Sequence, residues 1–388
     1  MTCFGSRQKS GPSAKADLGH SSRARLVVHG GSGQFDPKDY PPGKMALHRQ
    51  GMKEALHAGN DVLQAGGSAL DAVVAAVYTL ENNPLFNAGK GAVFNIEGKH
   101  ELEASLAVAG PPQGSNIPAN RKGAAVTLLK TVKHPVLLAK ELYMDPIACP
   151  HAFVSGPDAE RIAKEKGLEL VDEHYFDTEQ RWDEHKRGLR LMNPFTDDEK
   201  AMSEEERMAE FAKFPKGTVG AVALDKHGML ACATSTGGKT NKNVGRIGDT
   251  PSFGSGFYCS TWELPAKRRA RFLSRVLGRR RKDESSRSHA NGVAISGTGD
   301  GDYFLRNCAA YDVVARMKYQ NKTVQSASQE VVEFLKHEEG IGGLIAVDLQ
   351  GNFAMPLNST GMFRGTITPH ENVPRIAAWQ GENLTPET

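Results

Sequence analysis

The chain has 388 residues, 39% of them hydrophobic and 24% charged, and its formal net charge at pH 7 is +3. This composition is typical of a globular protein, and the small charge argues against nucleic acid as a partner. The five cysteines are widely spaced and include no Cys-x-x-Cys pair, which predicts reduced thiols in the cytoplasm. No apolar run approaches the roughly 20 residues of a membrane span, and the polar residues 1–22 predict a disordered tail without a secretory signal.

The first half of the chain predicts strands that alternate with helices. A short apolar run at 25–28 predicts a strand that enters a glycine turn at 29–33. Gly66-Gly67 stops one long helical pattern, and Ser68 is an N-cap for the next. The other elements expected here are helices at 46–65, 69–80, 134–143 and 158–166 and strands at 124–129 and 152–154.

The composition changes at residues 172–216. Charged residues dominate there, apolar periodicity fades, and Asp197–Glu206 is strongly acidic. We interpret this stretch as a mobile linker, although a plain surface loop would have the same composition. It ends directly before Gly217-Thr218, where a strand-like run begins.

The second half predicts antiparallel strands and two more helices. Apolar runs at 219–224 and 229–234 flank Asp225-Lys226-His227-Gly228, which predicts a hairpin with a positive φ at Gly228. The remaining elements expected are a strand pair at 293–296 and 303–305, helices at 309–317 and 324–337, and strands at 343–347 and 353–356. This order predicts helix layers packed on antiparallel sheets.

A basic insertion occupies residues 265–289. Within it, basic and apolar residues alternate at helical spacing over Lys267–Lys282. The pattern fits an amphipathic helix for an acidic partner, RNA or an anionic membrane, or a nuclear-import signal. A solvated surface insertion is the simpler interpretation, and we favour it.

Thr218 is the leading candidate for catalysis. If the bond after Gly217 broke, Thr218 would carry a hydroxyl nucleophile and an α-amine that can act as its base. The pKa of such an amine is about 7.7–8.0, close to what a general base needs near neutral pH. Thr236 ends the second strand of the predicted hairpin, which would place it beside Thr218.

Two further groups of residues suggest substrate binding and charge stabilisation. Arg246 and Asp249 can divide a zwitterion between them, because a guanidinium binds a carboxylate and a carboxylate binds an ammonium. Thr298 and Gly299 lie on a predicted turn, where a hydroxyl and an N–H can hold an oxyanion. The 29–33 segment lacks the spacing of a phosphate loop but can let main chain approach a reacting centre. The histidines form no zinc-type cluster.

Five blocks of sequence resemble the plant-type L-asparaginase / isoaspartyl peptidase family of N-terminal-nucleophile hydrolases. They are HGGSG at 29–33, NPLFNAGKGAVFN at 83–95, GTVGAVALD at 217–225, TSTGGKTNKNVGRIGDTP at 234–251 and GTGDGDYFLR at 297–306. Each block is loose alone, but all five in this order cover most of the chain.

The resemblance implies a precursor that cleaves itself between Gly217 and Thr218. An α subunit at 23–217 and a β subunit at 218–388 would then share one α+β domain. Its implied fold is a four-layer αββα sandwich of two antiparallel sheets between helix layers, assembled as a homodimer of αβ units. No cofactor is implied beyond a structural sodium ion, held by main-chain carbonyls of the 80–88 loop.

Roles also follow from the resemblance, position by position. Thr218 matches the nucleophile and Thr236 the threonine that supports it. Arg246 and Asp249 match the pair that holds the α-groups of the substrate. Thr298 and Gly299 match the oxyanion hole. Gly301 matches a main-chain position that faces the substrate, and Asn87 matches an asparagine near the nucleophile.

The chain departs from the family at two motifs besides the basic insertion. Leu102-Glu103-Ala104 stands where the family usually has Leu-Asp-Ala, and Val108-Ala109-Gly110 where it usually has Met-Asp-Gly. The implied function is hydrolysis of the β-amide of L-asparagine, of β-aspartyl peptides, or of both, through an ester on Thr218. The alternatives are a glycosylasparaginase, whose relatives are typically secreted and disulfide-bonded, and a scaffold that binds RNA or an acidic partner through 267–282.

Overall fold

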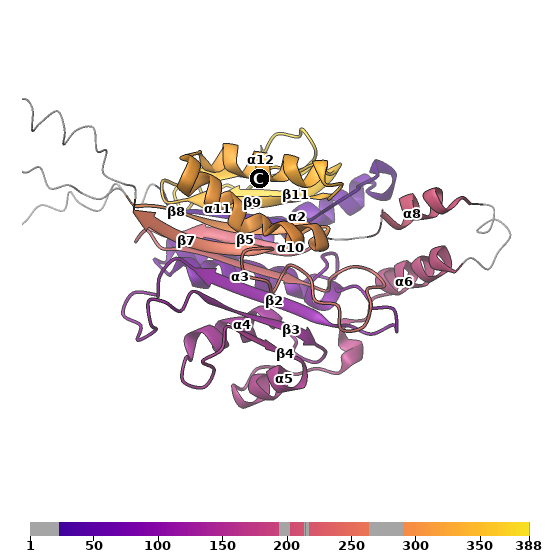
Figure 1. Cartoon of the computed structure of the whole chain (residues 1–388), viewed down its shortest axis with the longest axis horizontal. Helices are drawn as coiled ribbons and strands as arrows, with labels where there is room; N and C mark the ends of the chain where they lie inside the picture. The colour runs from indigo at the N-terminus through magenta and orange to yellow at the C-terminus, as the bar shows by residue number, and fades with distance from the viewer. Residues whose placement is uncertain (1–22, 194–201, 213, 215–216, 264–289, 388) are drawn as a thin grey trace, which may run out of the picture.

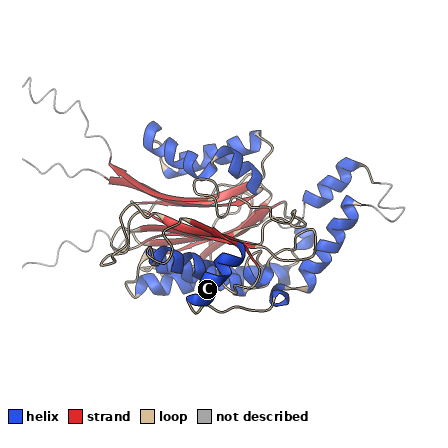
Figure 2. Cartoon of the chain, turned by 60° about the horizontal axis from the view of Figure 1, so that its bottom comes forward, coloured by secondary structure: helices blue, strands red, loops and turns tan. Residues whose placement is uncertain are grey.

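Two β-sheets stack face to face between two layers of helices (Figures 1 and 2). The computed structural model describes residues 23–193, 202–212, 214, 217–263 and 290–387. The predicted tail at 1–22 and the basic insertion at 265–289 lie outside the described residues. The arrangement confirms the predicted four-layer αββα sandwich.

The larger sheet has nine strands in the order β13-β12-β11-β1-β5-β6-β2-β3-β4 among the described residues. Neighbouring strands are antiparallel except β3 and β4, which run parallel and so correct the expectation of two purely antiparallel sheets. The strands are β1 Arg25–Gly33, β2 Leu102–Val108, β3 Gly123–Leu129, β4 Phe153–Ser155, β5 Val219–Leu224, β6 Leu230–Thr236, β11 Gly361–Ile367, β12 Arg375–Trp379 and β13 Thr385–Pro386.

The smaller sheet is antiparallel throughout, in the order β10-β9-β8-β7. Its strands are β7 Phe257–Glu263, β8 Ala290–Gly299, β9 Gly342–Asp348 and β10 Phe353–Ala354. Helices α11 and α12 cover its outer face, and α2, α3 and α4 cover the outer face of the larger sheet (Figure 1). The helices are α2 Pro42–Gln64, α3 Ala69–Asn82, α4 Pro135–Met144, α5 Gly156–Glu165, α6 Glu179–Met192, α8 Glu204–Ala212, α10 Gly301–Asn307, α11 Ala309–Gln320 and α12 Val324–His337, with short 3-10 turns η1 Pro37–Asp39, η2 Gly89–Gly91 and η3 Glu173–Phe176.

Strand alternation divides the apolar residues between separate cores. On β1, Leu26 and Val28 pack under the helices of the larger sheet, whereas Val27 packs between the two sheets. Side chains two residues apart on a strand point to the same face. Residues two or four positions from one that packs between the sheets therefore also face the smaller sheet. His29 on β1 follows Val27 on that face, and Thr218 precedes Val222 on β5 by four residues.

The hairpin of β5 and β6 forms as predicted. Gly228 adopts a φ of +84°, which favours glycine, and Asp225 accepts hydrogen bonds from the N–H groups of His227 and Met229. The predicted cap of α3 also forms, since the Ser68 hydroxyl accepts a hydrogen bond from the N–H of Asp71 at 3.1 Å. These local signals fix the edges of elements that carry the candidate site.

Two predictions around glycine segments are wrong. The 29–33 segment is not a turn, because β1 continues through it and pairs with β11 around a bulge. The predicted strand at 303–305 is the middle of helix α10. Phe304 on that helix is buried, with its ring against the space left by the missing side chains of Gly297 and Gly342. Packing against β8 and β9 therefore overrides a short apolar run.

The first part of the segment 172–216, interpreted above as a mobile linker, instead forms η3 and α6 with buried side chains. Thr178 caps α6 by accepting a hydrogen bond from the N–H of Arg181 at 3.3 Å. Phe176 and Arg181 are buried, and the Arg181 guanidinium donates to the carbonyl of Gly91 at 2.8 Å. The sequence did not predict α6, because its buried residues include an arginine and a histidine and so give no apolar periodicity. Both views place α6 and α8 at one end of the sandwich (Figures 1 and 2).

Candidate active site

Thr218 lies directly before β5, on the face of the larger sheet that is turned toward the smaller one. Its side chain is 4% exposed. Glu103 of β2 pairs with Thr236 of β6, and the β5–β6 register that joins Val219 to Ser235 sets Thr218 opposite Thr236. One row across three strands therefore holds a carboxylate and two hydroxyls. The predicted proximity of Thr218 and Thr236 follows from this register.

Thr298 on β8 bridges the two sheets at the predicted cleavage point. Its hydroxyl oxygen accepts hydrogen bonds from the N–H of Thr218 at 3.0 Å and from the N–H of Ser32 at 3.1 Å. Gly299 follows it with a φ of +137°, and a Cβ there would lie 2.3 Å from the carbonyl oxygen of Ile341. Glycine is the residue that this position accepts.

Gly217 touches the main chain of Gly31. A Cβ on Gly31, which has a φ of +111°, would lie 2.9 Å from the Cα of Gly217. A Cβ on Gly217 would in turn lie 2.7 Å from the Cα of Gly31. The glycines of 29–33 thus allow the main-chain approach that the sequence suggested, and it occurs beside the Gly217–Thr218 bond.

Asp249 is a buried carboxylate without a hydrogen-bond partner on Oδ2 among the described residues. A Cβ on Gly301 would lie 2.1 Å from Asp249 Oδ1, so the glycine leaves that oxygen room. Burial raises the pKa of Asp249 to about 7, while the charge of Arg246 opposes the rise. A bound cation would satisfy this oxygen and restore the charged form.

Arg246 lies beside Asp249 and is mostly buried. Its Nη2 donates to Asp302 Oδ1 at 2.8 Å. Burial alone would raise the pKa of Asp302, but the hydrogen bond and charge of Arg246 hold that pKa below its usual range. The sequence paired Arg246 with Asp249 and did not foresee Asp302, whose proximity depends on α10 being a helix.

Asn87 connects the Arg246 side to the Thr218 side. Its Nδ2 donates to the carbonyl of Gly238 at 2.7 Å, and its Oδ1 accepts from the N–H of Val93 at 3.0 Å. A Cβ on Gly238 would lie 3.4 Å from Arg246 Nη1. The hydroxyl of Thr236 accepts a hydrogen bond from the N–H of the same glycine, Gly238, at 3.0 Å. Asn87, Thr236 and Arg246 therefore meet around the turn that follows β6.

A buried polar chain lies under the start of β5 and was not predicted. His29 Nε2 is 2.8 Å from the hydroxyl of Ser296, which is 3.0 Å from the hydroxyl of Thr234. Burial lowers the pKa of His29 to about 3, so the ring is neutral at physiological pH. A Cβ on Gly220 would lie 2.4 Å from His29 Nε2, so that glycine makes room for the ring. No sequence signal links residues so far apart, although His29 begins one of the resembling blocks.

Glu103, at the first departure from the family, is fully buried. Its Oε1 accepts from the N–H of Gly248 at 2.9 Å and from the hydroxyl of Thr127 at 3.1 Å. Its charge acts on Arg246 and on the buried Lys242, whose pKa is lowered by burial. The glutamate thus holds the loop that carries Arg246 and Asp249, which the loose motif match did not reveal.

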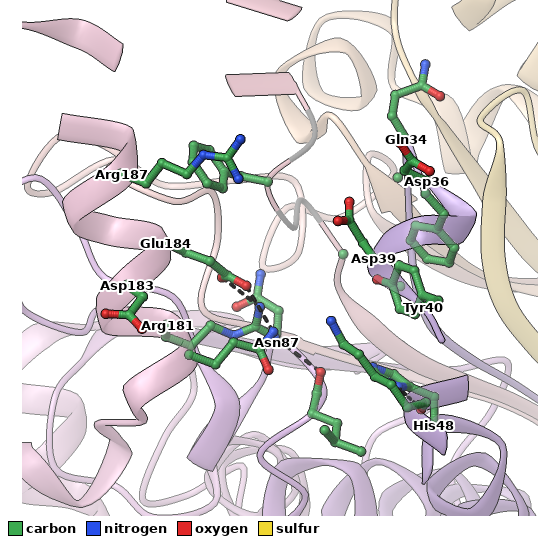
Figure 3. A pocket seen from close by; sticks show the side chains of 18 of the residues that line it. Gln34, Asp36, Asp39, Tyr40, His48, Asn87, Arg181, Asp183, Glu184 and Arg187 are labelled. Carbon is green, nitrogen blue, oxygen red and sulfur yellow. Dashed lines mark hydrogen bonds and ion pairs between the residues drawn. The ribbon is translucent and has the colours of Figure 1, made fainter. Parts of the chain in front are cut away.

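A cavity of about 570 Å³ opens on the other side of Gly217 (Figure 3). Gly31, Gly217 and Asn87 are among its lining residues, and side chains of η1, α2, α6, α8 and β11 also line it. Arg246 and Asp249 lie outside its lining. The cavity therefore reaches Gly217, the residue before Thr218, and Asn87, whose partner Gly238 lies close to Arg246.

Among the described residues, no three His, Cys, Asp or Glu side chains lie close enough together to hold a metal ion. In the 80–88 loop, main-chain carbonyls converge instead. A Cβ on Gly91 would lie 2.1 Å from the carbonyl oxygen of Phe86 and 2.5 Å from that of Pro84. A Cβ on Gly89 would lie 2.3 Å from the carbonyl oxygen of Glu81. Oxygen-only sites of this kind suit hard cations.

Residues 22–263 and 288–375 match a family model described as asparaginase. The isoaspartyl peptidase of Salmonella typhimurium is 37% identical over 344 residues, which cover 88% of this chain and 95% of the relative. The isoaspartyl peptidase of Escherichia coli is 35% identical and covers 88% of this chain and 92% of its own length. The isoaspartyl peptidase/L-asparaginase of Mus musculus is 35% identical over 87% of this chain and 86% of its own. No helix in the described part of the chain is long and apolar enough to cross a membrane.

Proposed function

We propose that this chain, which belongs to the asparaginase family of hydrolases, cleaves itself before Thr218 and then hydrolyses β-aspartyl amides through an ester on that residue. The substrates proposed are L-asparagine and isoaspartyl peptides. One observation carries the proposal. Thr218 is buried between the two sheets, where its N–H donates a hydrogen bond to Thr298, and the preceding Gly217 packs against the main chain of Gly31.

Maturation begins with attack by the Thr218 hydroxyl on the carbonyl carbon of Gly217. The amide C–N bond breaks, the hydroxyl proton passes to the departing nitrogen, and an ester joins Gly217 to Thr218 Oγ. Water then hydrolyses the ester and leaves a carboxylate on Gly217 and a free α-amine on Thr218. Thr298 Oγ1, 3.0 Å from that nitrogen, fixes its position throughout.

Turnover repeats the same acyl transfer on a bound substrate. The α-amine of Thr218 takes the hydroxyl proton, and the oxygen attacks the β-carbonyl carbon of the aspartyl group. The proton then goes to the leaving amine, which departs as ammonia or a peptide, and water hydrolyses the ester. Thr298 and Gly299 are proposed to hold the oxyanion, and Thr236 to support the nucleophile.

Arg246 and Asp249 are proposed to select the aspartyl end. The guanidinium of Arg246 binds the α-carboxylate, and the unpartnered Oδ2 of Asp249 accepts from the α-ammonium. Gly301 keeps Asp249 accessible, and Asn87 aligns the turn that reaches Arg246. A buried carboxylate without a partner cation costs free energy. A zwitterionic ligand removes that cost when its ammonium pairs with Asp249, and this favours such ligands over those without an ammonium.

Thr218→Ala tests the proposal, because it removes the nucleophile and little volume. The variant should remain one chain on a denaturing gel and release no ammonia from asparagine or leucine from β-aspartyl-leucine. Thr218→Ser is the matched control, and it should still cleave itself and turn over at a reduced rate. A cleaved or active Thr218→Ala protein would rule the proposal out.

The 80–88 loop is proposed to bind sodium through main-chain carbonyls. Those of Glu81, Pro84 and Phe86 converge near Gly89 and Gly91, and oxygen ligands of this kind suit a hard monovalent cation. Thermal unfolding of Thr218→Ala in sodium chloride should then occur at a higher temperature than in choline chloride at equal ionic strength. Equal melting temperatures in both salts would contradict the proposal.

The assembly and the compartment are also proposals. Two αβ units per particle follow from the family resemblance, and light scattering of the matured protein tests this number. Cys149, Cys232 and Cys259 are free and buried in the structure, which supports a reducing, cytoplasmic location.

A further inference from the structure

The cavity beside Gly217 has the position that a leaving group needs. In the proposed reaction, the aspartyl end lies at Arg246 and Asp249, and the bond that breaks lies at Thr218. The leaving amine must then extend away from Arg246. The cavity begins at Gly217, next to the bond that breaks, and its lining includes Gly31 but neither Arg246 nor Asp249. Its volume of about 570 Å³ lies within the range of small-ligand pockets and exceeds what ammonia requires.

Three of the six cations that line the cavity in the described part of the chain, all three of them on α6, pair with carboxylates. Arg181 pairs with Glu184, and Arg187 pairs with Glu210. Lys186, from the same helix, pairs with Asp183 on α6. Figure 3 shows Arg181, Asp183, Glu184 and Arg187 of α6 on one side of the cavity and Tyr40 and His48 on the other.

Lys44 differs from those cations. It lies in the first turn of α2, and its ammonium group is 4.8 Å from the centre of the Tyr40 ring. No carboxylate lies within ion-pair distance of Lys44 in the part of the chain that the structure describes. Burial raises the pKa of Tyr40 to about 12, so the ring beside the ammonium stays neutral. A half-buried lysine on an aromatic face is available to a carboxylate that enters the cavity.

We propose that this cavity is the leaving-group subsite of the enzyme and that Lys44 binds the α-carboxylate of the amino acid that an isoaspartyl dipeptide releases. The proposal rests on the proposed function, and it makes isoaspartyl peptides the favoured substrates over free asparagine. Ammonia has no carboxylate, so asparagine gains nothing from Lys44. The remaining volume accepts the leaving residue's side chain between Tyr40 and α6.

Three substrates measured on Lys44→Gln test the assignment. These are β-aspartyl-leucine, β-aspartyl-leucinamide and L-asparagine, and their KM values are compared between matured wild type and variant. The KM for β-aspartyl-leucine should rise about tenfold, as expected for loss of a partly exposed charged hydrogen bond. The KM values for the amide and for asparagine should not change, and kcat should be similar for all three.

Two matched variants complete the design. Lys44→Arg keeps the charge and should keep a low KM for β-aspartyl-leucine. Lys318→Gln removes an ammonium group that lies 5.2 Å from the centre of the Tyr319 ring on α11, outside the lining of the cavity, and it should leave all three KM values unchanged. Should Lys44→Gln fail to mature, the comparison of Lys44→Arg with wild type, and of acid with amide on wild type, still decides the question.

Other outcomes overturn the assignment. Equal changes for all three substrates, or no change for any, would show that Lys44 does not bind the leaving carboxylate. Faster turnover of all three by Lys44→Gln would show that the new carboxylate of Gly217 occupies Lys44 instead. A wild-type protein that hydrolyses none of the substrates would refute the proposed function itself, which is a separate result.

Discussion

The layer between the two sheets has two ends built from the same strands. At one end Val27, Val222, Leu230 and Val347 form an apolar core. At the other end, strands β1, β2, β6 and β8 and the residue before β5 carry buried polar groups at positions of the same alternation, namely His29, Glu103, Thr218, Thr234, Thr236, Ser296 and Thr298.

The contrast separates stability from chemistry along single strands. On β5, Val222 packs between the two sheets. Two residues earlier, Gly220 has no side chain, and this leaves room for the His29 ring. Polar groups at the second end are buried and largely hydrogen-bonded, which costs free energy that the apolar end supplies. Substitutions at the polar end should therefore alter reaction rates, and those at the apolar end should alter stability.

Thr298→Val should give the largest change in rate. The valine removes the acceptor for the N–H groups of Thr218 and Ser32 and removes the proposed oxyanion donor. We expect self-cleavage to slow by about a hundredfold or more, since one such donor contributes about 3 kcal/mol. The cleaved fraction on denaturing gels, followed over time, measures the effect. Thr298→Ser should restore most of the rate, and a Thr298→Val protein that matures normally would show that this hydroxyl is not needed.

Asp249 should make ligand affinity depend on pH. With a pKa of about 7, its carboxyl is mostly protonated at pH 6 and mostly charged at pH 8, and only the charged form pairs with an ammonium. The inhibition constant of L-aspartate should rise about tenfold from pH 8 to pH 6. Asp249→Asn should bind weakly with a flat profile, whereas a flat wild-type profile would contradict the assignment.

The same carboxyl should cost stability at neutral pH. Its folded-state pKa of about 7 exceeds the unfolded value of about 3.9, so the folded protein is penalised increasingly as pH rises from about 4 to 7. Asp249→Asn should melt at a higher temperature than wild type at pH 8, and the difference should shrink toward pH 4. The measurements use the uncleaved Thr218→Ala background, so that a single chain unfolds.

How far the sequence could predict this site depends on the range of each signal. The β5–β6 hairpin and the Ser68 cap were predictable because their signals are local. Strand β2 was missed, since buried Glu103 and Ser105 interrupt its apolar pattern. The proximity of His29 to Ser296 had no local signal at all, because strands from opposite ends of the chain bring them together. Residue chemistry suggested most of the candidate residues and the motif resemblance added Asn87 and Gly301, whereas their partners required the fold.

Val222→Ala tests the apolar end. The truncation leaves a void between the sheets and should lower the free energy of unfolding by about 2 kcal/mol. Denaturant unfolding in the Thr218→Ala background measures it. With Thr218 present, self-cleavage should proceed at the wild-type rate below the melting temperature. A large loss of cleavage rate without a loss of stability would show that the two ends are not separate.

Removing residues 264–289 should have the smallest effect. Glu263 pairs with Ala290, so β7 and β8 can be joined there by a two-residue Asn-Gly turn. Thr298 lies eight residues further along β8, roughly 26 Å away at strand spacing. Maturation and asparagine hydrolysis should match wild type. Salt-sensitive RNA retention that is lost with the insertion would instead support the scaffold function.

The most direct test of the account is the mass and N-terminal sequence of the purified protein after incubation. Self-cleavage before Thr218 should give two fragments, the second beginning Thr-Val-Gly-Ala from position 218. A single intact mass after long incubation, or a smaller fragment with any other N-terminus, would contradict it.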